Sequence, residues 1–287
     1  MFARLSRRRL LRQSALALGA SVLPGAPAQG GQFTGKIRKS LKWSMVAEAG
    51  NLPLAESFKK LRECGFEGVE PSLSHVPDDR VDDWLAASKA SGLIIDGTVG
   101  GRAATLESGV DLTRKLGGDS MLVVMSYDQK APLKPQWNAA RDRLKEAAPH
   151  AQNQGVKILV ENVWTTFLIS PFDMARFIDE VGSPWVAVHL DIGNQMRWGV
   201  AEHWVEVLGE RSQKLDVKEY DLNKAMSEGM RKGFDTPIGE GSINWPAVRA
   251  ELAKIQFTGW AAAEVKGGGW DYLADVARRM DRVLDLA

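Results

Sequence analysis

Short apolar runs alternate with amphipathic stretches from residue 39 to the end of the chain. A short apolar run is typical of a buried strand, and an apolar period of about 3.6 residues is typical of a helix. The pattern predicts strands at 40–46, 66–71, 93–98, 121–125, 156–161, 185–191, 214–218 and 260–265. It predicts helices at 54–63, 79–91, 105–116, 136–153, 172–181, 201–209, 245–254 and 271–285.

Residues at the expected helix boundaries support this assignment. Ser170 and Asn244 each precede a first turn that contains proline, so both are expected to cap helices. Glycine follows several of the predicted helices and is a common residue at helix ends. These glycines are Gly65, Gly92, Gly117, Gly155 and Gly182.

Alternating strands and helices of this kind predict a closed parallel (β/α)8 barrel, the TIM barrel of the α/β class. A doubly wound open sheet is the alternative. That fold normally has a G-x-G-x-x-G phosphate loop after its first strand, and residues 43–50 contain no such motif. No linker interrupts the alternation, so we predict one barrel domain at residues 33–287.

Residues 1–28 differ from the rest in composition. They contain five Arg, no Lys and no acid, then an apolar stretch at 15–23 and an A-x-A cleavage pattern at 26–28. Residues 6–12 read SRRRLLR, which resembles the twin-arginine export signal. A plain Sec signal or a basic amphipathic helix is the alternative. We expect a twin-arginine signal peptide at 1–28 and a mature protein in the periplasm or another extracytoplasmic space.

Composition excludes several classes of protein. The chain is 44% hydrophobic and 25% charged, which is typical of globular proteins, and Cys64 is its single cysteine, which excludes an internal disulfide. The first 28 residues hold five of the 37 basic residues and none of the 36 acidic ones, so the rest carries a formal charge of −4. Nucleic acid is therefore not an expected partner. No apolar run reaches the roughly 20 residues of a membrane span, so no stable membrane insertion is expected after signal removal.

Four consecutive predicted strands have a carboxylate at or near the C-terminal end, where the active sites of such barrels lie. These residues are Glu161, Asp191, Asp216 and Glu264. Converging carboxylates repel one another unless a cation neutralises them, and ligation by oxygen alone favours Mn²⁺ or Mg²⁺. The alternative is that each acid is solvated or caps a helix. We predict a divalent metal site formed by the four.

Several short phrases resemble the xylose-isomerase-like TIM barrel superfamily. They are GFEGVE at 65–70, ENV at 161–163, LDIGN at 190–194, VKEYD at 217–221, GEGSINW at 239–245 and the strand from Gly259 to Glu264. This superfamily contains sugar phosphate isomerases and epimerases, and the AP endonuclease family 2 enzymes of the endonuclease IV type. The resemblance covers nearly all of the chain after the predicted signal peptide.

The resemblance implies the same four metal ligands, with one departure. The family usually has His where this chain has Asp216, and the substitution adds negative charge and hardens the donor set, so Zn²⁺ is less favoured. A second departure is Asn194, because several epimerases have a substrate-contacting His there.

The chemistry that the resemblance implies is removal of a proton next to a carbonyl, with the enediolate stabilised by the metal. Glu161 and Glu264 would then act as catalytic acid and base as well as ligands. Lys218 shares an inward face with Asp216 and either holds a substrate oxygen or balances the acids. The substrate-binding candidates are Glu70, Trp43, Trp164, Asn194 and His189. Of these, His189 is expected one layer below Asp191, as a hydrogen-bonded partner of the site, and the tryptophans either contact sugar or fill the core.

These observations predict a divalent-metal-dependent sugar isomerase or epimerase with a small carbohydrate as its substrate. A lyase or hydrolase of 3-keto-glycosides would share the first step, and a non-catalytic carbohydrate-binding barrel is a further alternative. An endonuclease of the endonuclease IV type is disfavoured, because that site uses many His ligands and this chain has four His in all. The sequence leaves the oligomeric state open, a homo-oligomer included.

Overall fold

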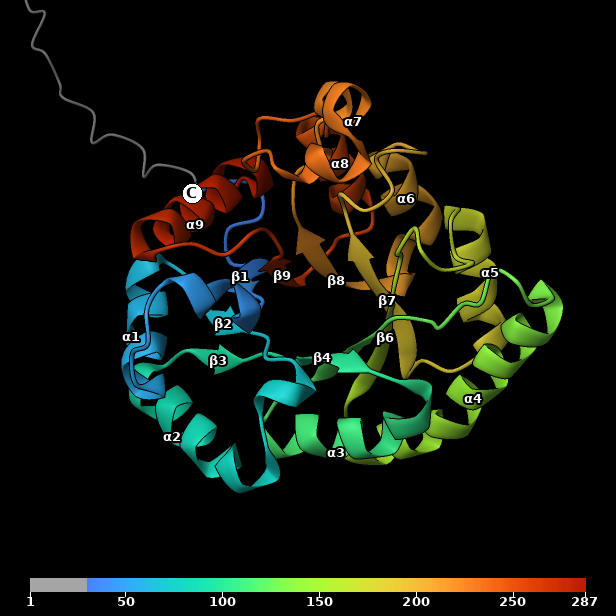
Figure 1. Cartoon of the computed structure of the whole chain (residues 1–287), viewed down its shortest axis with the longest axis horizontal. Coiled ribbons are helices and arrows are strands. Elements are labelled where there is room, and N and C mark those ends of the chain that lie inside the picture. The colour runs from blue at the N-terminus through green and yellow to red at the C-terminus, as the bar shows by residue number, and fades with distance from the viewer. Residues whose placement is uncertain (1–29) are drawn as a thin grey trace, which may run out of the picture. The chain divides into compact units, whose positions relative to one another are not determined.

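The computed structural model describes residues 30–287, so the predicted signal peptide at 1–28 lies outside the described residues. Residues Gly31–Ala287 form one compact unit. Figure 1 shows its strands around a common centre, with the helices on the outside of the ring. The predicted single-domain α/β TIM barrel is confirmed. Within residues 30–287, no helix combines the length and the apolar character needed to cross a membrane.

The strands of the described residues all pair in parallel. Seven of them form one sheet in the order β1-β9-β8-β7-β6-β5-β4, and β2 pairs with β3. Their bounds are β1 Ile37–Leu41, β2 Gly68–Val69, β3 Ile94–Ile95, β4 Thr98–Gly101, β5 Ser120–Val123, β6 Lys157–Glu161, β7 Val186–Asp191, β8 Ser212–Val217 and β9 Gly259–Ala263. Backbone bridges from Lys42 to Glu70 and from Ser72 to Val99 join the two sheets and close the ring.

The helices cover the outside of the barrel and begin and end close to the predicted positions. Their bounds are α1 Leu54–Cys64, α2 Val81–Ser91, α3 Leu106–Lys115, α4 Leu133–Gln154, α5 Pro171–Val181, α6 Ala201–Leu208, α7 Leu222–Glu228, α8 Trp245–Lys254 and α9 Trp270–Leu284. The Ser170 hydroxyl accepts a hydrogen bond from the Asp173 amide, 3.2 Å away, and Asn244 caps α8 in the same way. Gly65 ends α1 with a φ of +102°, which glycine adopts without strain.

Three segments differ from the prediction. The strand predicted at 93–98 is divided into β3 and β4, which belong to different sheets. β1 ends at Leu41, and a 3₁₀ helix at Trp43–Glu48 replaces the second half of the predicted strand 40–46. Met45 and Val46 are buried, so the apolar run continues through the turn, and periodicity alone does not separate the two structures. The loop predicted after the seventh strand contains α7, a helix of seven residues that buries only Ala225.

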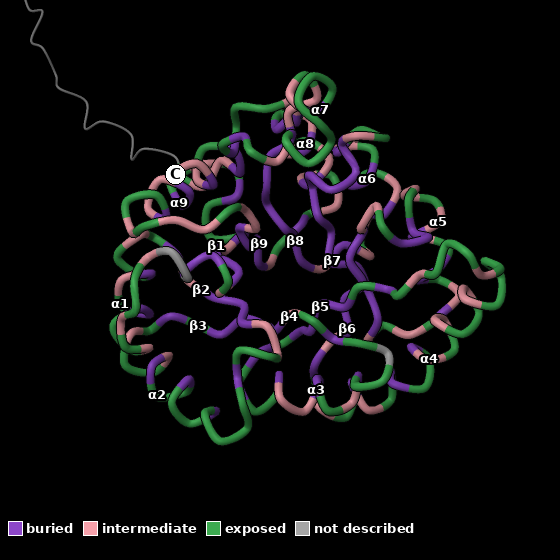
Figure 2. Tube along the Cα trace, in the orientation of Figure 1, coloured by how far each residue is buried: buried purple, intermediate pink, exposed green. Residues whose placement is uncertain are grey.

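Charged side chains are buried inside the barrel. Figure 2 shows that the central strands are almost continuously buried. The Lys214 ammonium on β8 lies 2.6 Å from Glu70 Oε1 and 2.7 Å from Asp96 Oδ2, and it donates a hydrogen bond to the Asp96 carbonyl at 3.2 Å. Burial of a charge is costly unless an opposite charge pairs with it. Lys214 therefore compensates two carboxylates, and of these only Glu70 has a second lysine partner among the described residues, Lys42.

We expect Lys214→Met to destabilise the barrel strongly, because it leaves Glu70 and Asp96 buried without their shared cation. Breaking a buried ion pair costs about 3–5 kcal/mol, whereas a surface pair contributes about 0–1 kcal/mol. The matched control is Lys254→Met, which removes an exposed lysine paired with Glu251 on α8. The measurement is the free energy of unfolding in urea. Equal losses in the two variants would contradict this account of the barrel interior.

Candidate metal and active site

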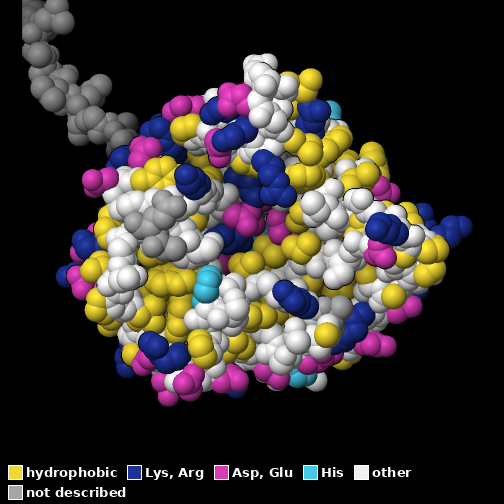
Figure 3. All heavy atoms as spheres, viewed as in Figure 1, with side chains coloured by type: hydrophobic (Ala, Val, Ile, Leu, Met, Phe, Trp, Pro, Cys, Tyr) yellow, Lys and Arg dark blue, Asp and Glu magenta, His cyan; other side chains and the backbone are white. Residues whose placement is uncertain are grey.

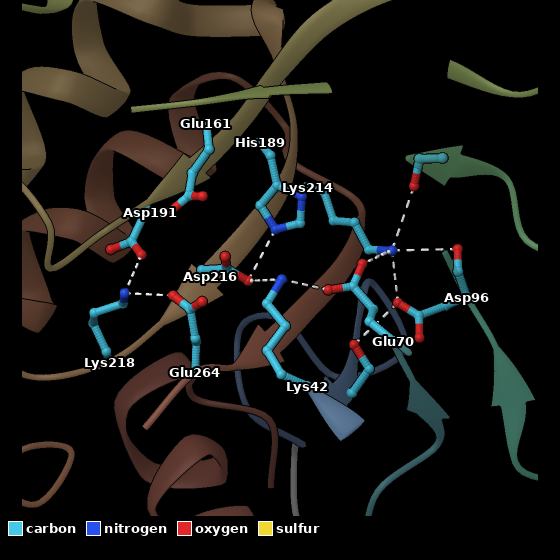
Figure 4. Close-up of polar contacts among 12 residues, drawn as sticks. Lys42, Glu70, Asp96, Glu161, His189, Asp191, Lys214, Asp216, Lys218 and Glu264 are labelled. Carbon is cyan, nitrogen blue, oxygen red and sulfur yellow. Dashed lines mark hydrogen bonds and ion pairs between the residues drawn. The ribbon is translucent and has the colours of Figure 1, made fainter. Parts of the chain in front are cut away.

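Four carboxylates meet where β6, β7, β8 and β9 end. Glu161 and Asp191 are the last residues of β6 and β7, Asp216 is the penultimate residue of β8, and Glu264 directly follows β9. Each of the four offers one ligand oxygen, and these oxygens lie within 4.8 Å of one another. Figure 4 shows the side chains pointing toward a common centre. We refer to Glu161, Asp191, Asp216 and Glu264 as the carboxylate quartet.

Asp191 is fixed by the loop that follows it. Its Oδ1 accepts hydrogen bonds from the backbone amides of Gly193 and Asn194, both at 2.8 Å. The Asn162 side chain also binds the backbone of Asp191: its Oδ1 accepts from the Asp191 amide at 2.7 Å, and its Nδ2 donates to the Asp191 carbonyl at 2.9 Å. These contacts leave Asp191 Oδ2 directed at the quartet, where the Lys218 ammonium lies 2.6 Å away.

Asp216 is fully buried, and its two oxygens differ. Oδ1 lies 2.7 Å from the Lys42 ammonium and 2.9 Å from His189 Nε2. Oδ2 has no hydrogen-bond partner among the described residues. One oxygen is therefore held by the protein, and the other is a free ligand atom.

Asn194 and Lys218 connect the remaining two acids. Asn194 uses both polar atoms of its side chain. Its Nδ2 donates to Glu161 Oε1 at 2.8 Å, and its Oδ1 accepts from the Lys218 ammonium at 3.1 Å. Lys218 also bonds Glu264, whose side chain is 34% exposed. Gly193 leaves the space that Lys218 needs, since a Cβ there would lie 2.4 Å from Lys218 Cγ. Glu264 is thus the quartet member most open to a ligand.

Burial and the neighbouring acids raise the pKa of two quartet members. Burial raises the pKa of Asp191 to about 7, and Glu264 and Asp216 add to the rise although Lys218 opposes it. Burial, Glu264 and Asp191 hold the pKa of Glu161 well above its ordinary value. Burial would raise the pKa of Asp216 too, but His189 and Lys42 outweigh it, so this pKa is depressed. The Lys218 ammonium alone does not neutralise the quartet.

The donor set fits a divalent cation. Four carboxylates supply oxygen ligands, and a buried Asp216 oxygen has no partner among the described residues. A bound cation would favour the ionised forms of Glu161 and Asp191, which burial and the neighbouring acids disfavour. Oxygen ligands suit Mg²⁺ and Mn²⁺, as the sequence predicts. The identity of the metal stays a prediction.

A polar cavity lies beside the quartet. It has a volume of about 410 Å³, and its lining includes Glu264, Lys218, Asn194, Trp164 and Arg231. Figure 3 shows acidic and basic side chains gathered at the hollow centre of this face. A larger, mainly apolar cavity of about 620 Å³ lies between α4 and the segment that follows β5, and its lining includes none of the predicted site residues. The polar cavity is therefore the candidate substrate site.

Three of the predicted substrate contacts lie elsewhere. Trp43 packs with Phe58 and Trp84 in an aromatic cluster, with ring centroids 5.7 Å and 5.1 Å away. Both Glu70 oxygens face lysines, and His189 is buried below the quartet against Asp216. The arrangement of His189 follows the prediction of a hydrogen-bonded partner. Trp43 contacts other aromatic rings, and Glu70 pairs with two lysines. A role in substrate binding stays a prediction for Trp43 and Glu70.

Sequence reasoning did not assign Lys42, Lys214 or Asp96 to the charged network. A signal was present for Lys214, because it alternates with Asp216 and Lys218 along one strand and so shares their inward face. Lys42 directly follows β1, which ends earlier than predicted. Arg231 reaches the cavity from the 3₁₀ helix at Met230–Phe234, inside the insertion that the pattern left as a loop.

The insertion between β8 and α8 is held by Glu219, which is buried. Its Oε2 accepts hydrogen bonds from the Gly239 amide at 2.7 Å and from the Trp245 indole at 3.0 Å. Its Oε1 accepts from the amides of Tyr220 and Ile243, at 3.1 Å and 3.3 Å. One carboxylate therefore joins the beginning and the end of the segment that carries Arg231.

Comparison with known proteins agrees with this geometry. The chain belongs to the family of xylose isomerase-like TIM barrels, whose model matches residues 58–283. It is 26% identical over 245 residues to SgbU of Escherichia coli (strain K12), covering 74% of this chain and 84% of that protein. The name of SgbU gives a proposed L-ribulose-5-phosphate 3-epimerase activity.

Solved structures share the fold at low sequence identity. The 3-keto-D-glucoside 4-epimerase YcjR of E. coli superposes with a TM-score of 0.70 and 15% identity, covering 86% of this chain and 98% of that one. A xylose isomerase-like barrel of Mycobacterium smegmatis, solved with magnesium, superposes with a TM-score of 0.66 and 19% identity, covering 88% of this chain and 98% of that one. The IOLI protein, solved with a zinc atom, superposes with a TM-score of 0.70 and 15% identity, covering 86% of this chain and 98% of that one. One of these structural relatives thus binds magnesium and the other binds zinc.

We expect Mn²⁺ or Mg²⁺ to stabilise the protein against unfolding, because a ligand that binds only the folded state adds about 2.7 kcal/mol at 100 times its dissociation constant. Asp191→Asn should lose most of this gain, whereas Asp79→Asn, on the exposed 3₁₀ helix at Asp78–Arg80, should keep it. The measurement is thermal unfolding of chelator-treated protein with and without added metal. An unchanged melting temperature in the unsubstituted protein would contradict the metal site.

Proposed function

We propose that this protein is a divalent-metal-dependent sugar isomerase or epimerase that removes a proton from the carbon next to a carbonyl. The observation that carries the proposal is the carboxylate quartet, with its excess negative charge, beside a polar cavity at the C-terminal end of the barrel. Membership of a family whose named relatives include sugar epimerases supports it. Shared fold alone does not define a reaction, so the argument rests on the site.

Glu161, Asp191, Asp216 and Glu264 would hold the ion, which would polarise the oxygens of the sugar and lower the pKa of the carbon acid. Glu161 and Glu264 come from strands on either side of β7 and β8. In the proposed reaction one of these carboxylates accepts the proton, and the C–H electron pair moves toward the carbonyl. The other then returns a proton to the same carbon from the opposite face, which inverts the centre. Alternatively, the proton goes to the neighbouring carbon while the hydroxyl proton moves to the former carbonyl oxygen, which isomerises the sugar.

Lys218 and Asn194 would orient the substrate and stabilise its developing negative charge. Burial lowers the pKa of Lys218, but Asp191 and Glu264 outweigh burial and raise it, so the side chain stays an ammonium. A fixed cation near the reacting oxygens stabilises charge without reorganisation. Trp164 lines the same cavity and packs against Trp198 with ring centroids 5.4 Å apart, which offers a flat wall for the apolar face of a sugar.

We expect Glu161→Gln and Glu264→Gln each to lower the rate of carbon-bound proton exchange by about 10²- to 10⁴-fold, the usual range for loss of an acid or base. The assay follows exchange into D₂O by ¹H NMR, with Mn²⁺ and a panel of ketoses, aldoses and 3-keto-glucosides. The control is Glu56→Gln, an exposed acid on α1.

The products of the same assay distinguish the alternatives. Release of the aglycone from a 3-keto-glucoside would replace the proposed isomerase with a lyase or hydrolase that shares its first step. Sugar binding without exchange, unaffected by Glu161→Gln, would identify a non-catalytic carbohydrate-binding barrel. Exchange that survives both glutamine variants would contradict the assigned acid and base.

We further propose that the enzyme works outside the cytoplasm, since the sequence SRRRLLR at 6–12 supports twin-arginine export. Arg7→Lys combined with Arg8→Lys should keep the protein in the cytoplasmic fraction in the unprocessed form. Arg4→Lys, outside the pattern, is the control and should be exported. Fractionation and immunoblotting of cells expressing the full chain measure the outcome, and export of the double variant would contradict the proposal.

A further inference from the structure

One buried cation beside the quartet has no part in the proposed reaction. The Lys42 ammonium lies 2.5 Å from Glu70 Oε2 and 2.7 Å from Asp216 Oδ1, and its side chain is 4% exposed. Figure 4 shows it between these two carboxylates. The backbone of Lys42 is held in place, because its amide donates to the Ala263 carbonyl at 3.0 Å and the residue forms a backbone bridge with Glu70. The ammonium is therefore held between the Glu70 and Asp216 carboxylates.

The groups around Lys42 are also those of a metal site. Glu70, His189 and Asp216 are buried, and each offers a ligand atom within 4.8 Å of the others. His189 Nδ1 has no hydrogen-bond partner among the described residues. Carboxylate and imidazole groups are both ligands of divalent transition metals. An ammonium thus lies among three groups that could hold a second ion.

Asp216 belongs to both groups and divides its oxygens between them. Oδ1 contacts Lys42 and His189, and Oδ2 is free on the side of the quartet. A carboxylate that bridges two metal ions gives one oxygen to each ion. Asp216 is arranged in the same way, except that the cation at its Oδ1 is the Lys42 ammonium. The positive charge of Lys42 also balances the negative charge of Asp216.

We propose that the Lys42 ammonium takes the place of a second divalent ion. It limits the site to one metal and leaves Asp216 to bind that metal through Oδ2 alone. The inference rests on the metal site of the proposed function. An ammonium can donate a hydrogen bond to a substrate oxygen or a water, but it cannot coordinate that oxygen as a metal ion does. All metal chemistry is thereby confined to the quartet, next to the polar cavity.

The test compares the Mn²⁺ stoichiometry of the unsubstituted chain with that of Lys42→Ala, by calorimetric titration and metal analysis of dialysed protein. We expect the variant to bind one more ion per chain, and Lys42→Ala combined with Glu70→Gln to lose it again. Lys39→Ala is the matched control, because Lys39 is a buried lysine on the same strand that pairs with Asp281 on α9. Electron paramagnetic resonance should show a spin-coupled pair in Lys42→Ala and an isolated Mn²⁺ in the unsubstituted protein.

The difference between the two proteins tests Lys42, and the count in the unsubstituted protein tests the quartet. An equal count in folded Lys42→Ala, verified by circular dichroism, would overturn the role of Lys42. An ion bound only by the variant would support that role while contradicting the proposed metal site. If the variant does not fold, titration of the unsubstituted protein with excess Mn²⁺ decides: a coupled pair overturns the inference, and one uncoupled ion supports it.

Discussion

The pairing of buried carboxylates with buried ammonium groups is the constraint on which this barrel depends. Parallel strands place every second side chain inside, and here many of those side chains are charged. In the deeper layer, Lys214 and Lys42 neutralise Glu70 and Asp96, and the cluster is closed by direct contacts. In the upper layer of the described barrel, Lys218 pairs with Asp191 and Glu264, and Lys42 reaches the quartet only at Asp216 Oδ1. Four acids there face two lysines, of which one is shared with Glu70. The deeper layer is therefore structural, and the unbalanced upper layer is the part able to recruit a cation.

The fold followed from the sequence because its signals are local. Alternating short apolar runs and amphipathic stretches define the strands and helices, and Ser170, Asn244 and the terminal glycines fix where the helices begin and end. The segment after Leu41 could not be predicted in the same way. Its apolar residues are buried in a 3₁₀ turn, and a strand or a turn satisfies the same pattern of burial.

The convergence of the quartet followed from topology, since the C-terminal ends of neighbouring parallel strands meet at one rim. The partners of the quartet did not follow. Lysines in a sequence are most often solvated, so nothing at Lys42 distinguished a buried ammonium from an exposed one. Its position depends on contacts across the closed ring, from β1 to β2 and β8, which no local pattern contains. Arg231 enters the cavity from an insertion with little buried surface, and such segments have the weakest sequence signals.

The anchoring of the insertion by Glu219 has an evolutionary consequence. Four hydrogen bonds to one carboxylate join both ends of the segment to the strand framework. Under the proposed function, mutations at positions of the segment that line the cavity, such as Arg231, would change the walls of the substrate site and leave the proposed acid and base in place. Evolution could thus change the substrate specificity of this barrel through mutations in the insertion, while the hydrogen bonds to Glu219 keep the insertion attached to the barrel.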